Sequence, residues 1–420
     1  APWTLMSYDV KQAFLNTSVE GFCRNVAVYP PKEACEPRGV VWVLRKYVYG
    51  LRGSPAGFHK DLLKIMEKEG FERSLDSLTT YVLREEGKVV GAVCWQVDDA
   101  LVAGTQAVQD AFQRVGRHLD FGKAESGSFR HCGLRLNQDQ TTGNITADQD
   151  EYIEGLQRVT VRLNQDGTVT EDCKDEARSL FGALCWVALA TAPHISARVS
   201  MAGSSMAEPT DKWIRDLNYT LQILQQMPSK LVYEAGHWPS PVIVGEADAA
   251  LGNLPKGGTQ GGMMVSMRDW DTDMSYMLSY ESKRIRRVVL SSLQAESAMQ
   301  VKLLDKTKWI QQLMSTLMGI SLEMVLKSDC KSLVEAVHSL SNVNRMKSQT
   351  KEVYGFREVL QRGEVKSMSH TPGVTNIPDG LTKDSVRGRH LTWQAAKGCV
   401  EPIWKNGARS SRWLGEPTMQ

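Results

Sequence analysis

Residues 91–103 read Gly-Ala-Val-Cys-Trp-Gln-Val-Asp-Asp-Ala-Leu-Val-Ala, so that two apolar runs flank Asp98 and Asp99. Apolar runs of this composition predict strands, and so brief an interruption predicts a tight turn between antiparallel neighbours. The aspartates allow two interpretations. Asp is a common turn former, so a solvated turn accounts for them. Adjacent carboxylates also hold the divalent cations that nucleotidyl transfer requires. The second interpretation needs a further strand-borne carboxylate, for which Asp9 is the candidate.

The sequence around this hairpin mixes helical and strand patterns without strict β-α-β alternation, which predicts an α+β fold. A polar stretch at 137–144 predicts a hairpin loop, and the Pro- and Gly-containing stretch 235–241 predicts an interdomain linker with a boundary near residue 238. The predicted elements before that boundary are helices at 56–69, 108–119, 149–156 and 179–202, the last interrupted near Pro193, and strands at 80–83, 89–97 and 100–103.

After residue 238 the pattern predicts an α/β layer with carboxylates at the ends of its elements. These are Asp248, Glu296, Asp329 and Asp379, each on a different predicted element. A solvated element end or a helix-dipole contact explains any one of them, whereas four together predict a functional cluster. The predicted elements are strands at 242–247, 261–267, 275–280, 287–290 and 324–327, and helices at 292–317, 331–339 and 351–361.

Length and composition limit the class of protein. The chain has 420 residues, enough for two or three domains, and its 42% hydrophobic and 23% charged residues exclude wholesale disorder and fibrous repeats. Its net charge of +2 gives no overall attraction for nucleic acid, so any such site must be local. Eight scattered cysteines predict reduced, mostly buried thiols. No apolar stretch is long enough to span a bilayer and the start lacks a signal-peptide pattern, which predicts an intracellular fragment, in cytoplasm or nucleus.

Five segments of the first half carry a family resemblance. Ser7-Tyr8-Asp9-Val10-Lys11-Gln12-Ala13-Phe14-Leu15-Asn16 resembles the first palm motif of copia-type retrotransposon reverse transcriptases, Asp-Val-Lys-x-Ala-Phe-Leu-Asn. Residues 44–55 are similar to the family's Leu-Tyr-Gly-Leu-Lys-Gln-Ala-Pro element, and Val97-Asp98-Asp99 to its Tyr-Val-Asp-Asp box. Residues 132–136 stand where the family grips the primer, and residues 180–193 resemble its helical connection.

This resemblance implies roles for particular residues. Asp9, Asp98 and Asp99 would hold Mg²⁺ or Mn²⁺, and Phe14 would crowd the 2′-hydroxyl and so select deoxynucleoside triphosphates. The chain departs from the family at Gln96, where the box has an aromatic residue, and only eight residues precede Asp9, where the family has a fingers region. We therefore expect primer extension by this fragment alone to fail.

The carboxylates of the second half resemble the copia-type ribonuclease H domain. Its four motifs appear in order, and the most specific is Asn376-Ile-Pro-Asp-Gly-Leu-Thr-Lys383. The resemblance implies that Asp248, Glu296, Asp329 and Asp379 hold two metal ions that activate water against the RNA strand of an RNA–DNA hybrid. His370 is open to two readings, a proton shuttle or, as its spacing favours, the position of a structural aromatic residue.

A local run of basic residues bears on whether the chain binds nucleic acid. Lys283-Arg-Ile-Arg-Arg287 places four cations in five residues before the long helix, which suits phosphate contacts but also suits a charge-protected edge strand. The predicted domains are 1–237, reverse transcriptase palm, thumb and connection; 238–384, ribonuclease H-like; and 385–420, a basic, poorly ordered tail.

The predicted function is RNA-directed DNA polymerase with ribonuclease H activity, acting on RNA and DNA template-primers and hybrids. The alternative is an inactive retroelement remnant that keeps the fold and at most binds nucleic acid.

Overall fold

The computed structural model describes residues 3–17, 26–272, 274–339 and 350–399. These residues form two compact units. The first comprises the described residues within Ala1–Cys132, Gln138–Gly143 and Thr316–Gly319, and the second those within Gly133–Asn137, Asn144–Ser315 and Ile320–Gln420. Between residues 132 and 144 the chain passes from one unit to the other, around the predicted hairpin loop. The predicted boundary near residue 238, between the reverse transcriptase and ribonuclease H-like domains, stays a prediction.

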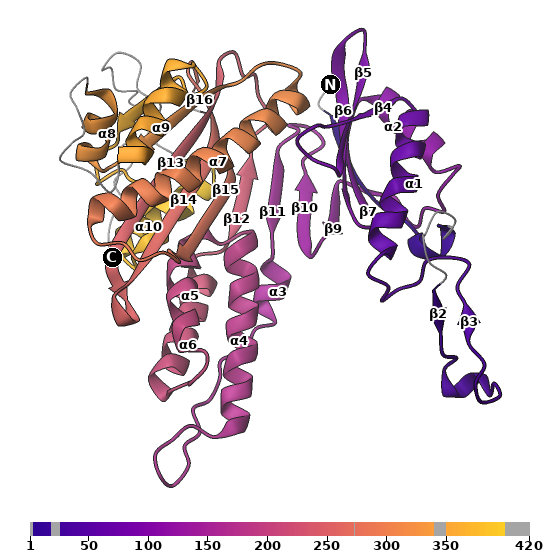
Figure 1. Cartoon of the computed structure of the whole chain (residues 1–420), viewed down its shortest axis with the longest axis horizontal. Helices are drawn as coiled ribbons and strands as arrows, with labels where there is room; N and C mark the ends of the chain where they lie inside the picture. Colours follow the sequence, from indigo (N-terminus) through magenta and orange to yellow (C-terminus); the bar gives the residue numbers. More distant parts are fainter. Residues whose placement is uncertain (1–2, 18–25, 273, 340–349, 400–420) are drawn as a thin grey trace. The chain divides into compact units, whose positions relative to one another are not determined.

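The first unit is built on a six-stranded sheet of order β4-β5-β6-β7-β1-β8, in which neighbouring strands are antiparallel (Figure 1). Two helices pack on it, α1 (Ser54–Lys68) and α2 (Gln106–Val115). The strands are β1 (Thr4–Asp9), β4 (Phe71–Arg73), β5 (Thr80–Glu85), β6 (Lys88–Gln96), β7 (Asp99–Gly104) and β8 (Glu125–Ser126); the short pieces η1 (Ala13–Asn16), β2 (Ala27–Val28), η2 (Lys32–Ala34), β3 (Trp42–Val43) and β9 (Ser128–His131) complete the unit.

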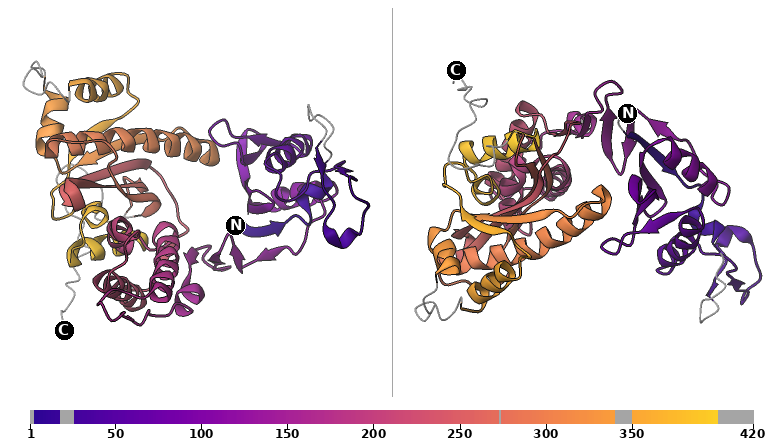
Figure 2. Two further views of the ribbon diagram at one scale, coloured as in Figure 1. Left: turned by 60° about the horizontal axis from the view of Figure 1, so that its bottom comes forward. Right: turned by 90° about the horizontal axis from the view of Figure 1, so that it is seen from above.

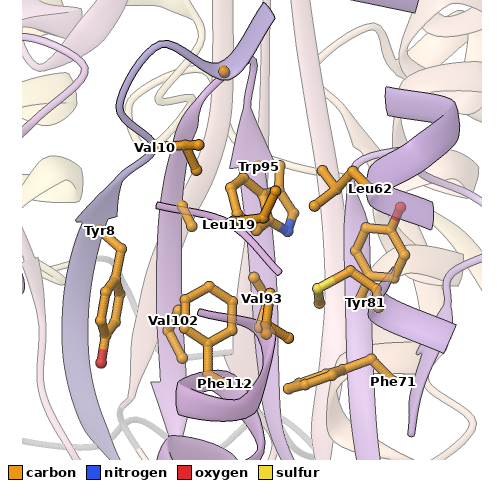
Figure 3. Close-up of a cluster of buried hydrophobic side chains, with 14 of the residues drawn as sticks. Tyr8, Val10, Leu62, Phe71, Tyr81, Val93, Trp95, Val102, Phe112 and Leu119 are labelled. Atoms are coloured by element: carbon orange, nitrogen blue, oxygen red, sulfur yellow. The ribbon is translucent and has the colours of Figure 1, made fainter. Parts of the chain in front are cut away.

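Strand alternation explains why one face of this sheet is covered. In β6, Val93 and Trp95 are buried while Cys94 and Gln96 are exposed, because successive side chains point to opposite faces. The buried residues meet Leu62 of α1 and Phe112 of α2 in one apolar cluster (Figure 3). Gly91 permits the close approach of α2, since a Cβ there would lie 2.6 Å from Cγ2 of Val108.

The second unit contains a five-stranded sheet of order β15-β14-β13-β16-β17. β13 pairs antiparallel with β14 and parallel with β16, and β16 pairs parallel with β17. The strands are β13 (Pro241–Leu254), β14 (Gly258–Asp269), β15 (Ser275–Arg284), β16 (Glu323–Ser328) and β17 (Ser367–His370), with η5 (Pro255–Gly257) between β13 and β14. The predicted ribonuclease H-like α/β domain is therefore present, and the α+β fold class is confirmed.

Helices cover both faces of this sheet (Figure 2). Gly261 and Gly262 of β14 point to opposite faces; a Cβ at Gly261 would meet Met299 of α7 (Ser292–Met318), and one at Gly262 would meet Leu381 of α10 (Asp379–Thr382). α8 (Lys331–His338) and α9 (Thr350–Gln361) follow β16. The catalytic candidates on α7 and α10 thus approach the sheet from different sides.

A helical layer formed by residues 150–226 belongs to the same unit. Its apolar core includes Leu184, Ile195 and Leu217, and it packs against β15, α10 and the helix α11 (Val386–Ala396). Its helices are α3 (Asp150–Glu154), α4 (Glu171–Ala190), η3 (Pro193–Ile195), α5 (Ser196–Ala202), η4 (Gly203–Ser205) and α6 (Asp211–Gln226). Three strands lie before and after this layer in the chain, β10 (Leu134–Gln138), β11 (Ile145–Asp148) and β12 (Lys230–Tyr233).

Three predictions were wrong. Residues 386–396 form α11 (Val386–Ala396), capped by the Ser385 hydroxyl, rather than the start of a poorly ordered tail; residues 400–420 lie outside the described part. Residues 287–290 form no strand, and Val288 and Leu290 are exposed. The seven described cysteines are unpaired as predicted, but only Cys173 is buried.

Within the described ranges, no helix has the length and hydropathy required to cross a membrane.

Candidate metal centres

Antiparallel pairing brings together the palm carboxylates, Asp9, Asp98 and Asp99. Asp9 ends β1 directly opposite Asp99, the first residue of β7, and the backbone nitrogen of Val10 donates to the carbonyl of Asp98. Like charges directly opposite each other on neighbouring strands are destabilising. The register therefore places two like-charged side chains opposite each other, at a cost to stability.

The turn that presents Asp98 has an uncommon backbone. Val97 adopts a φ of 60°, which β-branched residues rarely do, while the flanking Gln96 and Asp99 pair across the hairpin. Strained residues of this kind persist where surrounding structure enforces them, often next to functional groups.

Burial raises the pKa of Asp99, and the neighbouring charge of Asp98 raises it further. His131, whose Nδ1 lies 3.0 Å from the Ser7 hydroxyl, opposes this shift through its positive form. His131 was not among the predicted site residues, because it is distant in sequence from both aspartates.

Phe14 lies on η1, immediately after the palm aspartate strand. Its ring is buried and makes an edge contact with Tyr49, with centroids 4.9 Å apart, and a longer one with Phe58. The ring is therefore fixed within the first unit, as a residue that limits the room beside a nucleotide must be. Its role in nucleotide selection stays a prediction.

The nuclease carboxylates, Asp248, Glu296, Asp329 and Asp379, all lie in the second unit. Asp248 is on the central strand β13 and Asp329 directly follows the adjacent parallel strand β16, where Ala247 pairs with Ser328. Glu296 lies in the first turns of α7, and Asp379 is the first residue of α10. Asp248 lies within β13, which continues to Leu254, and not at the end of its strand as predicted.

Three of these carboxylates converge. One oxygen from each of Asp248, Glu296 and Asp329 lies within 4.8 Å of the other two. No other set of three His, Cys or acidic ligand atoms in the described part of the chain meets that distance, neither with Asp379 nor among the palm carboxylates. The geometry thus defines a nuclease trio of Asp248, Glu296 and Asp329.

Burial dominates the electrostatics of the trio. It raises the pKa of Glu296 to about 9 and that of Asp248 to about 6, and mutual repulsion among the carboxylates adds to both shifts. The pKa of Asp329 is also raised, chiefly by burial. Three carboxyl groups so close together repel one another when they are ionised, and this repulsion favours their protonated forms.

The residues present fit a divalent cation. Glu296 is 7% exposed, its Oε1 accepts from the Ala249 backbone nitrogen at 3.1 Å, and its Oε2 has no hydrogen-bond partner among the described residues. A buried carboxylate oxygen without a partner is costly. Carboxylate oxygens are the ligands preferred by Mg²⁺ and Mn²⁺.

The fourth carboxylate, Asp379, has different partners. Its Oδ1 accepts from Lys383 Nζ at 2.6 Å, and its Oδ2 lies 3.5 Å from Arg387. Lys383 Nζ also lies 3.8 Å from Asp248 Oδ2. Lys383 stands four residues after Asp379 on the same helical face, a spacing visible in the sequence but not used to select it.

Two polar side chains hold Asp248 in place. Asn376 Nδ2 donates to Asp248 Oδ1 at 3.2 Å, and the Thr382 hydroxyl donates to Asp248 Oδ2. His370 ends β17, and its Nε2 lies 3.2 Å from the backbone carbonyl of Asp329 rather than from a carboxylate. Its proposed proton-shuttle role has no support from this contact.

Comparisons with known proteins agree with the motif resemblance. Residues 1–170 match the family model described as Reverse transcriptase (RNA-dependent DNA polymerase), a span that contains Phe14 and the palm carboxylates. Two Arabidopsis thaliana proteins, the Retrovirus-related Pol polyproteins from transposons RE2 and RE1, are 25% and 24% identical. Each match covers 91% of this chain and 26% of the relative, so the chain spans about a quarter of their length. The resemblance to copia-type Pol polyproteins is confirmed.

Solved structures are more distant. RNase H1 from the halophilic archaeon Halobacterium salinarum is 18% identical, and the match covers 33% of this chain and 93% of that one with a TM-score of 0.25. The foamy viral protease-reverse transcriptase in complex with dsDNA is 11% identical over 89% of this chain and 69% of that one, with a TM-score of 0.22.

Proposed function

We propose that the second unit hydrolyses the RNA strand of an RNA–DNA hybrid. The chain that contains it matches the reverse transcriptase family over residues 1–170. The observation that supports this most directly is the nuclease trio, with its buried, unpartnered Glu296 oxygen. Asp248, Glu296 and Asp329 would hold Mg²⁺ or Mn²⁺. When bound, the cation would lower the pKa of a coordinated water and stabilise charge on the phosphate.

The protein's own groups supply orientation. Asn376 and Thr382 fix the Asp248 carboxylate, and the Ala249 backbone nitrogen fixes one oxygen of Glu296. In the proposed hydrolysis a water oxygen bonds to phosphorus, one P–O bond of the RNA backbone breaks, and the departing oxygen takes up a proton. The water gives its own proton to solvent.

We further propose that the palm carboxylates support RNA-directed DNA synthesis from deoxynucleoside triphosphates on a template-primer. The register that places Asp9 opposite Asp99, inside the span that matches the polymerase family, favours this second activity. Phe14 would limit the space for a 2′-hydroxyl. The relevant test is primer extension compared between the unaltered chain and Asp99→Asn. Extension that disappears in Asp99→Asn would support this activity and would overturn the expectation that this chain alone fails to extend a primer.

The exposed cations of residues 283–287 support a hybrid as the nuclease substrate. Ile285 is buried and anchors the segment, while the four cations around it are exposed. Two of them have acidic partners, Lys283 with Glu281 and Arg287 with Glu352. Phosphate contacts of this kind weaken as salt rises.

The experiment for the nuclease proposal uses an end-labelled RNA–DNA hybrid, Mg²⁺ and the full chain. We expect cleavage of the RNA strand that disappears in Asp329→Asn and in EDTA. The matched control is Asp305→Asn, an exposed aspartate on α7, which should leave cleavage unchanged. Equal cleavage by the unaltered chain and Asp329→Asn, or none by either, would refute the proposal and favour an inactive remnant.

A further inference from the structure

Lys383 lies between two carboxylates of the nuclease centre. Its Nζ is 2.6 Å from Asp379 Oδ1 and 3.8 Å from Asp248 Oδ2. Asp248 is a member of the nuclease trio, whereas Asp379 is not. The ammonium therefore lies beside the trio, between Asp248 and Asp379.

Both carboxylate oxygens of Asp379 lie close to cationic side chains of the protein. Lys383 binds Oδ1, and Arg387 approaches Oδ2 at 3.5 Å. Its side chain is 9% exposed, so water does little to compensate its charge. A carboxylate in this position anchors two cationic side chains, which is a different task from coordinating a metal ion.

Charge balance favours a single divalent ion. When all four nuclease carboxylates are ionised, as cation binding requires, they face two cationic side chains, Lys383 and Arg387, which leaves two negative charges. One divalent cation in the trio neutralises them. A second ion next to Lys383 would place like charges together in a largely buried site.

We propose that Lys383 takes the place of a second divalent cation, so that the nuclease centre binds one such ion, in the trio of Asp248, Glu296 and Asp329. This inference rests on the proposed nuclease function and replaces the two-metal form predicted from the family resemblance. The side chain of Lys383 is 48% exposed, so its ammonium can reach a non-bridging oxygen of a bound phosphate. Asp379 is then a positioning residue for Lys383.

The test counts bound Mn²⁺ by electron paramagnetic resonance of the free ion, at neutral pH without substrate. All chains carry Asp98→Asn and Asp99→Asn, so that the palm carboxylates do not contribute, and Asp248→Asn on that background defines zero. Lys383→Met removes the charge while keeping the length of the side chain, and Lys383→Arg restores it. Lys331→Met is the control, because Lys331 is exposed and pairs only with Glu335 among the described residues.

We expect one Mn²⁺ above the reference in the background chain, in Lys331→Met and in Lys383→Arg, and two in Lys383→Met. Two ions in the background chain, or one in Lys383→Met, would overturn the role of Lys383 and leave the proposed nuclease standing. No ion above the reference in the background chain would overturn the proposed function, and this inference with it. Circular dichroism of each variant checks that the fold is retained.

Discussion

Replacing Glu296 with Gln should stabilise the cation-free protein, although it removes a residue of the proposed nuclease trio. Glu296 is 7% exposed, and burial raises its pKa to about 9 from an ordinary 4.5. Between these values the unfolded chain has the carboxylate ionised while the folded protein keeps it protonated. Folding must then take up a proton, so the stability of the unaltered chain falls as pH rises from 4.5 toward 9.

The size of the effect follows from the pKa difference. Each pKa unit corresponds to about 1.4 kcal/mol, so at about pH 7.5 the proton uptake lowers the free energy of unfolding by roughly 4 kcal/mol. Gln is neutral and nearly isosteric, and its Oε1 can still accept from the Ala249 backbone nitrogen. We expect Glu296→Gln to recover most of that amount.

The assay is urea unfolding in EDTA at several pH values, followed by a signal from the second unit. The advantage of Glu296→Gln should grow by about 1.4 kcal/mol per pH unit above about pH 4.5 and vanish below it. Mg²⁺ should stabilise the unaltered chain and have less effect on the variant, because ligand binding to the folded state adds stability. A variant that is less stable at neutral pH, or an advantage that does not change with pH, would refute the reasoning.

Three further substitutions test other parts of the structure. Val97→Gly should raise the free energy of unfolding of the first unit by about 0.5–1 kcal/mol in urea, since glycine adopts a φ of 60° freely and the Val97 side chain is exposed; a loss would contradict the strained turn. Gly380→Ala should lower the free energy of unfolding by more than about 2 kcal/mol and impair hybrid cleavage, because the added Cβ would lie 2.1 Å from the Gly388 carbonyl oxygen. Its control is Gly355→Ala, which meets open space within α9 and should be neutral or stabilising. Asp384→Asn should lower the free energy of unfolding by about 1–2 kcal/mol, discounted for partial exposure, because it removes the negative charge and one of the two oxygens that face Arg198 and Arg389; unchanged unfolding would show that this network is solvent-screened.

Local patterns were sufficient to predict most of the elements around the two centres. The hairpin of β6 and β7 follows from the two apolar runs that flank Asp98 and Asp99, and helix α7 follows from apolar spacing after a serine. The strand predicted over the run Val288–Leu290 was wrong, since apolar composition alone does not show whether a neighbouring strand is available for pairing. Val288 and Leu290 are exposed in a loop.

The missed helix and the missed lysine have a shared physical cause. α11 has weak apolar periodicity and contains Gly388, so its sequence favours no element; it is held by tertiary contacts, including Gly388 against Gly380 and Trp393 Nε1 to the Pro228 carbonyl at 3.0 Å. Lys383 is 135 residues from Asp248 along the chain, so its contact depends on the sheet. Residue spacing predicts neighbours within one helix, but not across a fold.

The packing of α11 limits how this polypeptide can be divided into modules. The segment after the last nuclease carboxylate folds back onto residues 193–195 and 230–233, which precede the first nuclease strand. A recombinant nuclease cut at residue 238 would lose those partners and expose the apolar side of β15 and α11. Such a piece should be prone to aggregation, whereas one that begins near residue 144 keeps the layer intact. The two ends of this module are therefore set by contacts rather than by the linker that the sequence displays.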